Sequence, residues 1–141
     1  MKQIFTTLLF IFVNGLIYAQ PSQEINDEKF IVTHGPYLQH PGETDVTFVW
    51  TTNKAAIAWV ELAPDDSTNF YHTERKKYFS ASHGLKNVDT IHVVHIGYLQ
   101  PGTKYRYRIF SQEVLSHKGV EVRYGEVVAT RVFMRRPPSF R

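Results

Sequence analysis

The chain has 141 residues, the size of a single domain. Its 16 Lys and Arg are interspersed with 13 Asp and Glu, so the net charge of +3 does not indicate a nucleic-acid-binding protein. The absence of cysteine excludes disulfide scaffolds, cysteine-ligated zinc, iron–sulfur clusters and thiol nucleophiles. Hydrophobic residues make up 43% of the chain, which is enough to build a core.

Residues 1–19 have the layout of a secretory signal peptide, with a positive start at Lys2, an apolar run over 4–17 and the small residue Ala19 before a polar segment. The apolar run is shorter than the roughly 20 residues that span a bilayer, and an uncleaved membrane anchor is the alternative. We therefore expect an exported protein, periplasmic or extracellular, with no membrane attachment after signal cleavage. The polar residues 20–29 predict a flexible leader.

From residue 30 onward the apolar residues alternate with a period of two, which predicts β-strands rather than helices. In the segment 45–52 the residues expected to face inward are Val46, Phe48 and Trp50. In the segment 104–109 they are Tyr105, Tyr107 and Ile109. Further strand candidates cover 30–34, 57–62, 78–80, 91–96 and 126–133. Turn residues separate them at Gly35-Pro36, Pro41-Gly42, Asn53, Pro64-Asp65-Asp66, Pro101-Gly102 and Tyr124-Gly125, which together predict an antiparallel β-sandwich.

The segment 99–105 reads L-Q-P-G-T-K-Y, the pattern of a tyrosine corner. Its structural residues are Leu99, Pro101, Gly102, Thr103 and Tyr105. We expect Leu99 to close one end of the core and the Tyr105 hydroxyl to reach back to an upstream backbone group; an exposed binding aromatic at Tyr105 is the alternative. The corner resembles the one between strands E and F of fibronectin type III domains, and Trp50 falls where that fold keeps its strand-B tryptophan. The resemblance implies an all-β, antiparallel fibronectin type III or immunoglobulin-like β-sandwich over residues 30–134.

A narrower resemblance comes from three segments taken together with this corner: G-P-Y-L-Q at 35–39, V-T-F-V-W-T-T at 46–52 and I-H-V-V-H-I at 91–96. Over about 31–134 the chain is similar to the N-terminal domain of purple acid phosphatases, and more closely to that of bacterial exported metallophosphoesterases. The resemblance implies that His92 is structural, partly buried at the end of the sandwich with a hydrogen-bond partner.

The ligand motifs of a dinuclear metallophosphoesterase, D-x-H, G-D-x-x, G-N-H-(E/D) and G-H-x-H, do not occur in the chain. His92 and His95 stand three apart on a strand, so they should project to opposite faces and share no ion. Asp65 and Asp66 lie in a Pro-marked turn and are expected to be solvated, although a glycosidase-type carboxylate pair remains an alternative. We therefore expect no catalytic or metal residue and no cofactor in this chain. The resemblance places a dinuclear metal only in a separate catalytic domain.

Residues 135–141, R-R-P-P-S-F-R, predict a stiff linker. By resemblance the linker leads toward a catalytic phosphoesterase domain that this chain lacks and that would be its partner in cis. The leading interpretation is a non-catalytic accessory domain of an exported metal-dependent phosphatase. The alternative is a free-standing fibronectin-like module that binds a surface protein or a glycan. No nucleic-acid partner is expected, and homo-oligomerisation is left open.

The alternation also predicts a basic candidate interface. Lys104, Arg106 and Arg108 should form an outward row, either as a solvated strand face or to pair with acids on a neighbouring domain or attract an anionic substrate.

The second candidate interface is on the strand 57–62, where Glu61 should face solvent because burying an unpaired carboxylate is costly. A period of two then turns Ile57 and Trp59 outward and Ala58 and Val60 inward. Three outcomes are open for Trp59: the connection 63–89 folds back over it, it seats a missing domain or a second copy of the chain, or a bulge reverses the phase.

Overall fold

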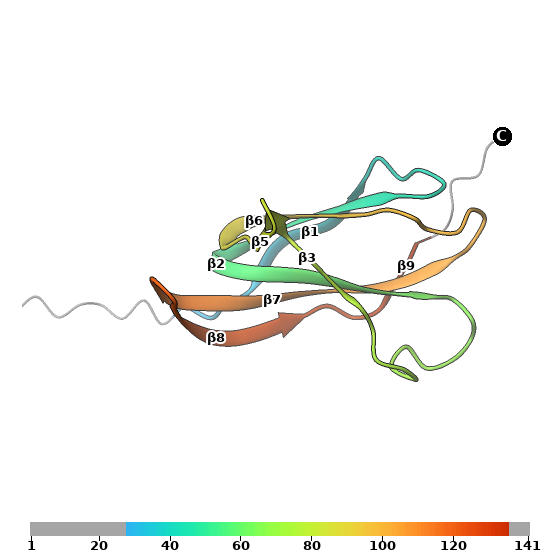
Figure 1. The fold of residues 1–141 in the computed structure, drawn as a ribbon. Coiled ribbons are helices and arrows are strands. Elements are labelled where there is room, and N and C mark those ends of the chain that lie inside the picture. The colour runs from blue at the N-terminus through green and yellow to red at the C-terminus, as the bar shows by residue number, and fades with distance from the viewer. Residues whose placement is uncertain (1–27, 136–141) are drawn as a thin grey trace, which may run out of the picture.

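The computed structural model describes residues 28–135; the signal peptide assigned to 1–19, most of the leader 20–29 and the linker after Arg135 lie outside the described residues. Within 28–135 the regular elements are all strands, and no helix of this part is long and apolar enough to cross a membrane. The strands are β1 (Val32–Gln39), β2 (Val46–Pro64), β3 (Lys77–Phe79), β4 (Ala81–Ser82), β5 (Leu85–Lys86), β6 (Asp89–Ile96), β7 (Tyr105–Lys118), β8 (Glu121–Ala129) and β9 (Phe133–Arg135). Every pairing is antiparallel, which confirms the predicted all-β sandwich (Figure 1).

The long strand β2 takes part in both layers of the sandwich. Its first half pairs with β1 on one side and with β6 on the other. Its second half, from Ala56 to Pro64, pairs with β7 on one side and with β3 on the other. One layer is therefore β1–β2–β6, and the second is β3–β2–β7 with β8 and β9 on the far side of β7 (Figure 1).

Asn53 does not form the turn predicted for it, because β2 continues through it from one layer to the other. Its side chain instead fastens the segment before β1. The Ile31 amide donates to Asn53 Oδ1 at 2.9 Å, and Asn53 Nδ2 donates to the Lys29 carbonyl at 2.9 Å. An amide side chain that satisfies backbone groups of a neighbouring segment stabilises that segment much as a ladder partner would.

The core lies between the two layers and is built from the inward residues of the alternating strands. Its buried residues are Val46, Phe48, Trp50, Ala58, Val60, Val94, Ile96, Leu99, Tyr105, Tyr107 and Ile109. Trp50 is fully buried, and its indole Nε1 donates to Ser111 Oγ on β7 at 2.9 Å. The largest core side chain therefore has its polar atom satisfied by the opposite layer.

The tyrosine corner forms between β6 and β7. The Tyr105 hydroxyl accepts a hydrogen bond from the Gln100 amide at 2.9 Å, so it does reach back to the upstream backbone. Leu99 packs in the core, and its amide donates to the Thr44 carbonyl at 2.8 Å. Gly102 has a φ of 69°, a left-handed conformation that a turn of this kind leaves to glycine. We call this end of the sandwich the corner end.

Two further turn predictions are wrong. Gly35 and Pro36 lie inside β1 and are joined by a cis peptide bond. A Cβ on Gly35 would come within 2.8 Å of the Val49 carbonyl, so the glycine permits close approach of two strands rather than a chain reversal. The reversal expected at Tyr124-Gly125 occurs instead before β8, at Gly119, where φ is 59°.

Candidate interaction surfaces

The outer face of the layer β3–β2–β7 is covered along β2. Ala58 and Val60 lie in the core, so the phase of the strand is as predicted and no bulge reverses it. On the opposite face, however, Ile57, Trp59 and Glu61 are only 5%, 8% and 6% exposed. The prediction that Glu61 faces solvent is wrong. Ile57 and Trp59 do point away from the core, as predicted, but a second set of residues covers them.

Trp59 is covered from both neighbouring strands. Its ring stacks on Phe110 of β7 with centroids 5.1 Å apart and planes at 2°, and it contacts Phe79 of β3 at 5.6 Å. The ammonium of Lys77 lies 5.3 Å from the indole centroid, within the range of a cation–π interaction. Lys77 and Phe79 belong to the connection 63–89, so of the three outcomes the folded-back connection is the one observed. We call residues 65–79 the covering segment.

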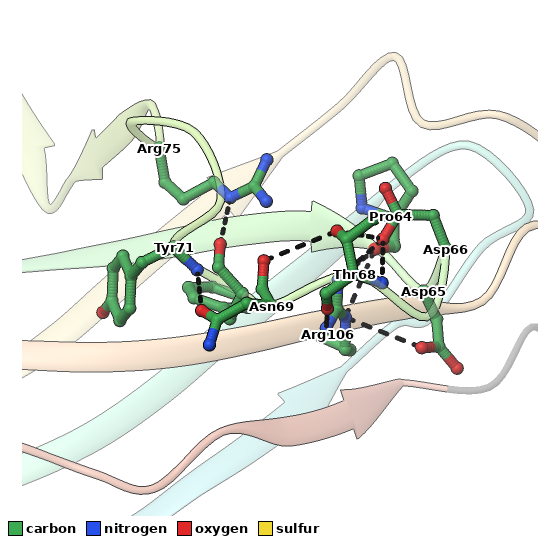
Figure 2. Close-up of polar contacts among 9 residues, drawn as sticks. Pro64, Asp65, Asp66, Thr68, Asn69, Tyr71, Arg75 and Arg106 are labelled. Atoms are coloured by element: carbon green, nitrogen blue, oxygen red, sulfur yellow. Dashed lines mark hydrogen bonds and ion pairs between the residues drawn. The ribbon is translucent and has the colours of Figure 1, made fainter.

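Arg106 fastens the beginning of the covering segment through the polar contacts shown in Figure 2. Its side chain points away from the core, as predicted, but is buried under this segment. Its guanidinium donates to the Pro64 carbonyl from Nε and Nη2, to the Thr68 carbonyl from Nη1, and to Asp66 Oδ1 from Nη2 at 2.9 Å. Asp65 Oδ1 lies 3.6 Å from Nε. The turn after β2 exposes carbonyl oxygens that need donors, and a planar guanidinium can serve several of them at once.

Asp66 is half exposed, but it is not a free carboxylate. The hydroxyl and the amide of Thr68 both donate to Asp66 Oδ1, at 2.7 and 3.1 Å. These hydrogen bonds, followed by the charge of Arg106, hold the pKa of Asp66 below its ordinary value. Asp65 and Asp66 thus share one cation in a structural turn. Asp66 is exposed, as expected, whereas Asp65 is largely shielded from solvent.

Arg108 holds the middle of the covering segment. Its Nη1 donates to the Tyr71 hydroxyl at 2.8 Å, and its guanidinium lies 5.5 Å from the Tyr71 centroid and 5.0 Å from that of Phe110. Its Nε donates to the Thr130 carbonyl at 2.8 Å. Of the predicted basic row Lys104, Arg106 and Arg108, only Lys104 remains exposed, because the other two bind the chain's own connection.

Glu61 is buried between two strands that carry cations. In the sheet it lies opposite Lys77 on β3 and opposite Arg108 on β7. Trp59 Nε1 donates to Glu61 Oε1 at 3.3 Å, while Oε2 has no hydrogen-bond partner within the described chain. Burial, together with the nearby Glu61 carboxylate, raises the pKa of Tyr71. The cationic neighbours come from two other strands, so the burial of Glu61 is invisible in its own segment.

His92 is fully buried, and its tautomer follows from its partner. The Thr52 hydroxyl donates to the Lys54 carbonyl at 2.8 Å, so Thr52 Oγ1 accepts from His92 Nε2 at 2.9 Å and the ring proton is on Nε2. The unprotonated Nδ1 has no partner among the described residues, and burial lowers the pKa of His92 to about 4. His95 is exposed on the opposite face of β6, so the two histidines cannot share an ion.

No group of three or more His, Asp or Glu side chains within 28–135 is placed to hold a metal ion. The residues of this part of the chain therefore do not fit a dinuclear phosphoesterase centre, which needs clustered oxygen and nitrogen ligands around two cations.

The outer face of the other layer, β1–β2–β6, is open. Three cross-strand rows form this open face: His34–Thr51–Ile91, Tyr37–Val49–Val93 and Gln39–Thr47–His95. None of these residues is Lys, Arg, Asp or Glu. Its apolar side chains are well exposed, at 56% for Tyr37, 58% for Ile91 and 49% for Val93.

Hydrogen bonds border the open face on both sides of its apolar centre. Thr47 Oγ1 and His95 Nδ1 lie 3.0 Å apart, and Thr51 Oγ1 contacts His34 Nδ1 at 3.3 Å. The sequence analysis considers His95 only as a possible metal ligand. It proposes none of the other residues of the open face as an interaction site. Part of the signal was present, since the alternation that turns His92 and Val94 inward turns Ile91 and Val93 to the outer face.

A shallow pocket of about 810 Å³ adjoins the open face at the corner end. It lies between β3 and β6 and is lined by Thr44, Asp45, Lys76, Tyr78, His95, Ile96, Gly97 and Tyr98. Tyr98 is fully exposed and has a φ of 61°, and the Lys76 ammonium lies 4.9 Å from the Tyr78 ring centroid. His95 belongs both to the pocket and to the open face.

Two antiparallel layers shared by β2, the buried Trp50 and the tyrosine corner define a fibronectin type III-like β-sandwich. Residues 34–124 match the family described as Purple acid Phosphatase, N-terminal domain. The chain belongs to this family, and the resemblance seen in its motifs is confirmed. No curated protein sequence matches the chain.

Proposed function

We propose that this chain is the non-catalytic accessory domain of an exported metal-dependent phosphatase, and that it packs on a catalytic phosphoesterase domain and shapes the approach to that domain's site. The observation that carries the proposal is the family match over 34–124. It is supported by the lack of a metal-holding cluster within the described residues. Export is part of the proposal and rests on the signal-like residues 1–19.

The division of labour follows from the chemistry. Phosphoester hydrolysis by this class needs a dinuclear metal to polarise the phosphoryl oxygen and to generate hydroxide. The proposal assigns that metal wholly to the partner domain in cis. The residues of this chain then supply a rigid sandwich and an interaction surface, with no cofactor of their own.

The test is hydrolysis of an aryl phosphate by the segment 20–141 with iron, zinc or manganese added. We expect no turnover above that of the free metal ion. Metal-dependent activity that co-purifies with the segment would contradict the non-catalytic role. A parallel reading of the encoding frame beyond codon 141 should find D-x-H and G-N-H motifs, and a stop codon there would contradict the role as an accessory domain.

One observation favours a second candidate, a free-standing module that binds a glycan. The pocket at the corner end presents Tyr78 and Tyr98 beside the polar side chains of Lys76 and His95. Aromatic surface with a few hydrogen-bonding groups is the usual composition of a small-ligand site. Binding of soluble glycans to the segment 20–141, lost in Tyr98→Ala and kept in Tyr124→Ala, would favour this candidate.

A further inference from the structure

The open face has the composition of the centre of an interface. Its middle row is Tyr37, Val49 and Val93, and its flanking Thr and His side chains form hydrogen bonds. None of the nine residues in its three rows is Lys, Arg, Asp or Glu. Depletion of charge and enrichment of aromatic residues are what distinguish the buried centre of an interface from ordinary surface.

The other broad face of the sandwich is occupied by the chain itself along β2, whereas Val127 of β8 is exposed there. The covering segment lies over Trp59, and the guanidinium groups of Arg106 and Arg108 bind carbonyl and hydroxyl oxygens of the chain's own connections. The expectation that Trp59 seats a second domain therefore fails within the described part of the chain, whereas the open face leaves Tyr37, Ile91 and Val93 exposed.

We propose that the open face is the surface on which a covalently linked phosphoesterase domain packs. This inference rests on the proposed function and adds to it the place of contact. The contact centres on Tyr37, Val49, Ile91 and Val93, with His34 and His95 at its border.

The size of the open face favours a tethered partner over a second copy of the chain. Three neighbouring strands, each about five residues long, cover a projected area of roughly 250 Å². Because side chains protrude from the sheet, its solvent-accessible area is on the order of a few hundred Å². A stable complex of separate chains buries about 800 Å² on each partner. A covalent link supplies an effective concentration on the order of millimolar, so a small apolar face suffices within one chain.

The course of the chain places a following domain near this face. The last described strand, β9, pairs with the first residues of β7, with Arg135 opposite Tyr105. The described chain thus leaves the sandwich at the corner end (Figure 1). At that end lies the row Gln39–Thr47–His95 of the open face, and His95 also lines the adjoining pocket.

The test is modification of histidine by diethyl pyrocarbonate, read by mass spectrometry, in the segment 20–141 and in the natural protein isolated from its source. His34 and His95 border the open face, and His117, near the opposite end of β7, is the internal control; all three are exposed. In the segment we expect all three to react. In a natural protein that continues into a phosphoesterase domain, we expect His34 and His95 to react at least tenfold more slowly while His117 is unchanged.

The outcomes separate the two proposals. A natural protein that ends near Arg141 overturns both. A longer protein in which His34 and His95 react as fast as in the segment overturns the open face as the contact and leaves the accessory role standing. Protection of His34 and His95 in the segment itself, with the mass of a dimer, would assign the face to a second copy and overturn the tethered contact.

A matched pair of variants in the longer protein adds a second readout. Val93→Lys places a charge in the middle of the open face, and Val120→Lys places one on a loop tip away from it, where Val120 is fully exposed. We expect Val93→Lys to restore the reactivity of His34 to that of the segment, and Val120→Lys to leave the protection intact. We expect the segment with Val93→Lys to have the same thermal unfolding midpoint as the unmodified segment. That result would show that the substitution does not affect folding.

Discussion

The rings of Trp59 on β2 and Phe110 on β7 lie parallel, with centroids 5.1 Å apart and planes at 2°. They are direct neighbours across the sheet, on the face away from the core. The pair closes a second, smaller apolar layer beneath the covering segment, so the strand that carries Trp59 is buried on both sides.

We expect Trp59→Ala to lower the free energy of unfolding by about 3–5 kcal/mol, because a large buried ring is lost with its stacking partners. Val127→Ala is the control, since Val127 lies on the same layer and is 46% exposed; we expect a change within about 0.5 kcal/mol. Urea unfolding of the segment 20–141 measures both. Equal stability of the two variants would contradict the buried second layer.

Replacement of Arg106 by Met should lower the free energy of unfolding by roughly 2–3 kcal/mol, because the Pro64 and Thr68 carbonyls lose their donors in a half-buried turn. The covering segment should also become the first site of proteolysis. Arg106→Lys should recover only part of the loss, since an ammonium cannot span the same set of acceptors. Lys104→Met, at the exposed end of the row, is the control and should leave both measurements unchanged.

Tyr105→Phe should cost about 1–3 kcal/mol of unfolding free energy, because it leaves the Gln100 amide without its acceptor at the corner. Trp50→Ala should cost more, about 3–5 kcal/mol, through lost core volume. Thermal unfolding of the two variants beside the unmodified segment is the measurement. If both variants have the same unfolding midpoint as the unmodified segment, then neither the corner nor the inter-layer tryptophan contributes to the stability of the fold.

Acid should destabilise the domain through His92. Its pKa is about 4 in the folded chain, against an ordinary value of 6.5, so the unfolded chain binds more protons between these values. The free energy of unfolding is therefore unaffected above pH 6.5 and falls as the pH is lowered from 6.5 toward 4, by about 3 kcal/mol in all.

The measurement is urea unfolding at pH 7 and at pH 4.5. In His92→Phe the part of the pH dependence due to this residue should vanish, whereas His95→Phe, altered on the exposed face of the same strand, should keep it. A His92→Phe variant with the full loss of stability at pH 4.5 would show that another group is responsible.

Much of the sandwich could be predicted from local pattern. A period of two tells which residues of a strand share a face, so Val46, Phe48 and Trp50 on one strand and Tyr105, Tyr107 and Ile109 on another were assigned inward and are buried. The corner was equally readable, because Leu99, Pro101, Gly102 and Tyr105 each have a mechanical role set by residues within one turn of chain.

Two kinds of local signal were misread. Turn-forming residues at Asn53 and at Gly35-Pro36 lie within strands, because asparagine and glycine also serve where one strand must bond to or approach another closely. The split of 126–133 into β8 and β9 was likewise missed, since it depends on which part of β7 each piece pairs with.

The sequence by itself therefore determined the strand faces, the corner and the family, since each depends on residues close together in the chain or on short motifs that can be read directly from it. Only the tertiary structure decided which outer face is covered. Period two separates the two faces of a strand but cannot say what lies on the far one. Glu61 and Trp59 are buried because Lys77, Phe79, Arg108 and Phe110 arrive from two other strands, and Ile91 and Val93 are exposed because nothing within the described chain returns to cover them. Burial on the outer side of a sheet is a property of long-range contacts, so it is settled only when the connections fold back.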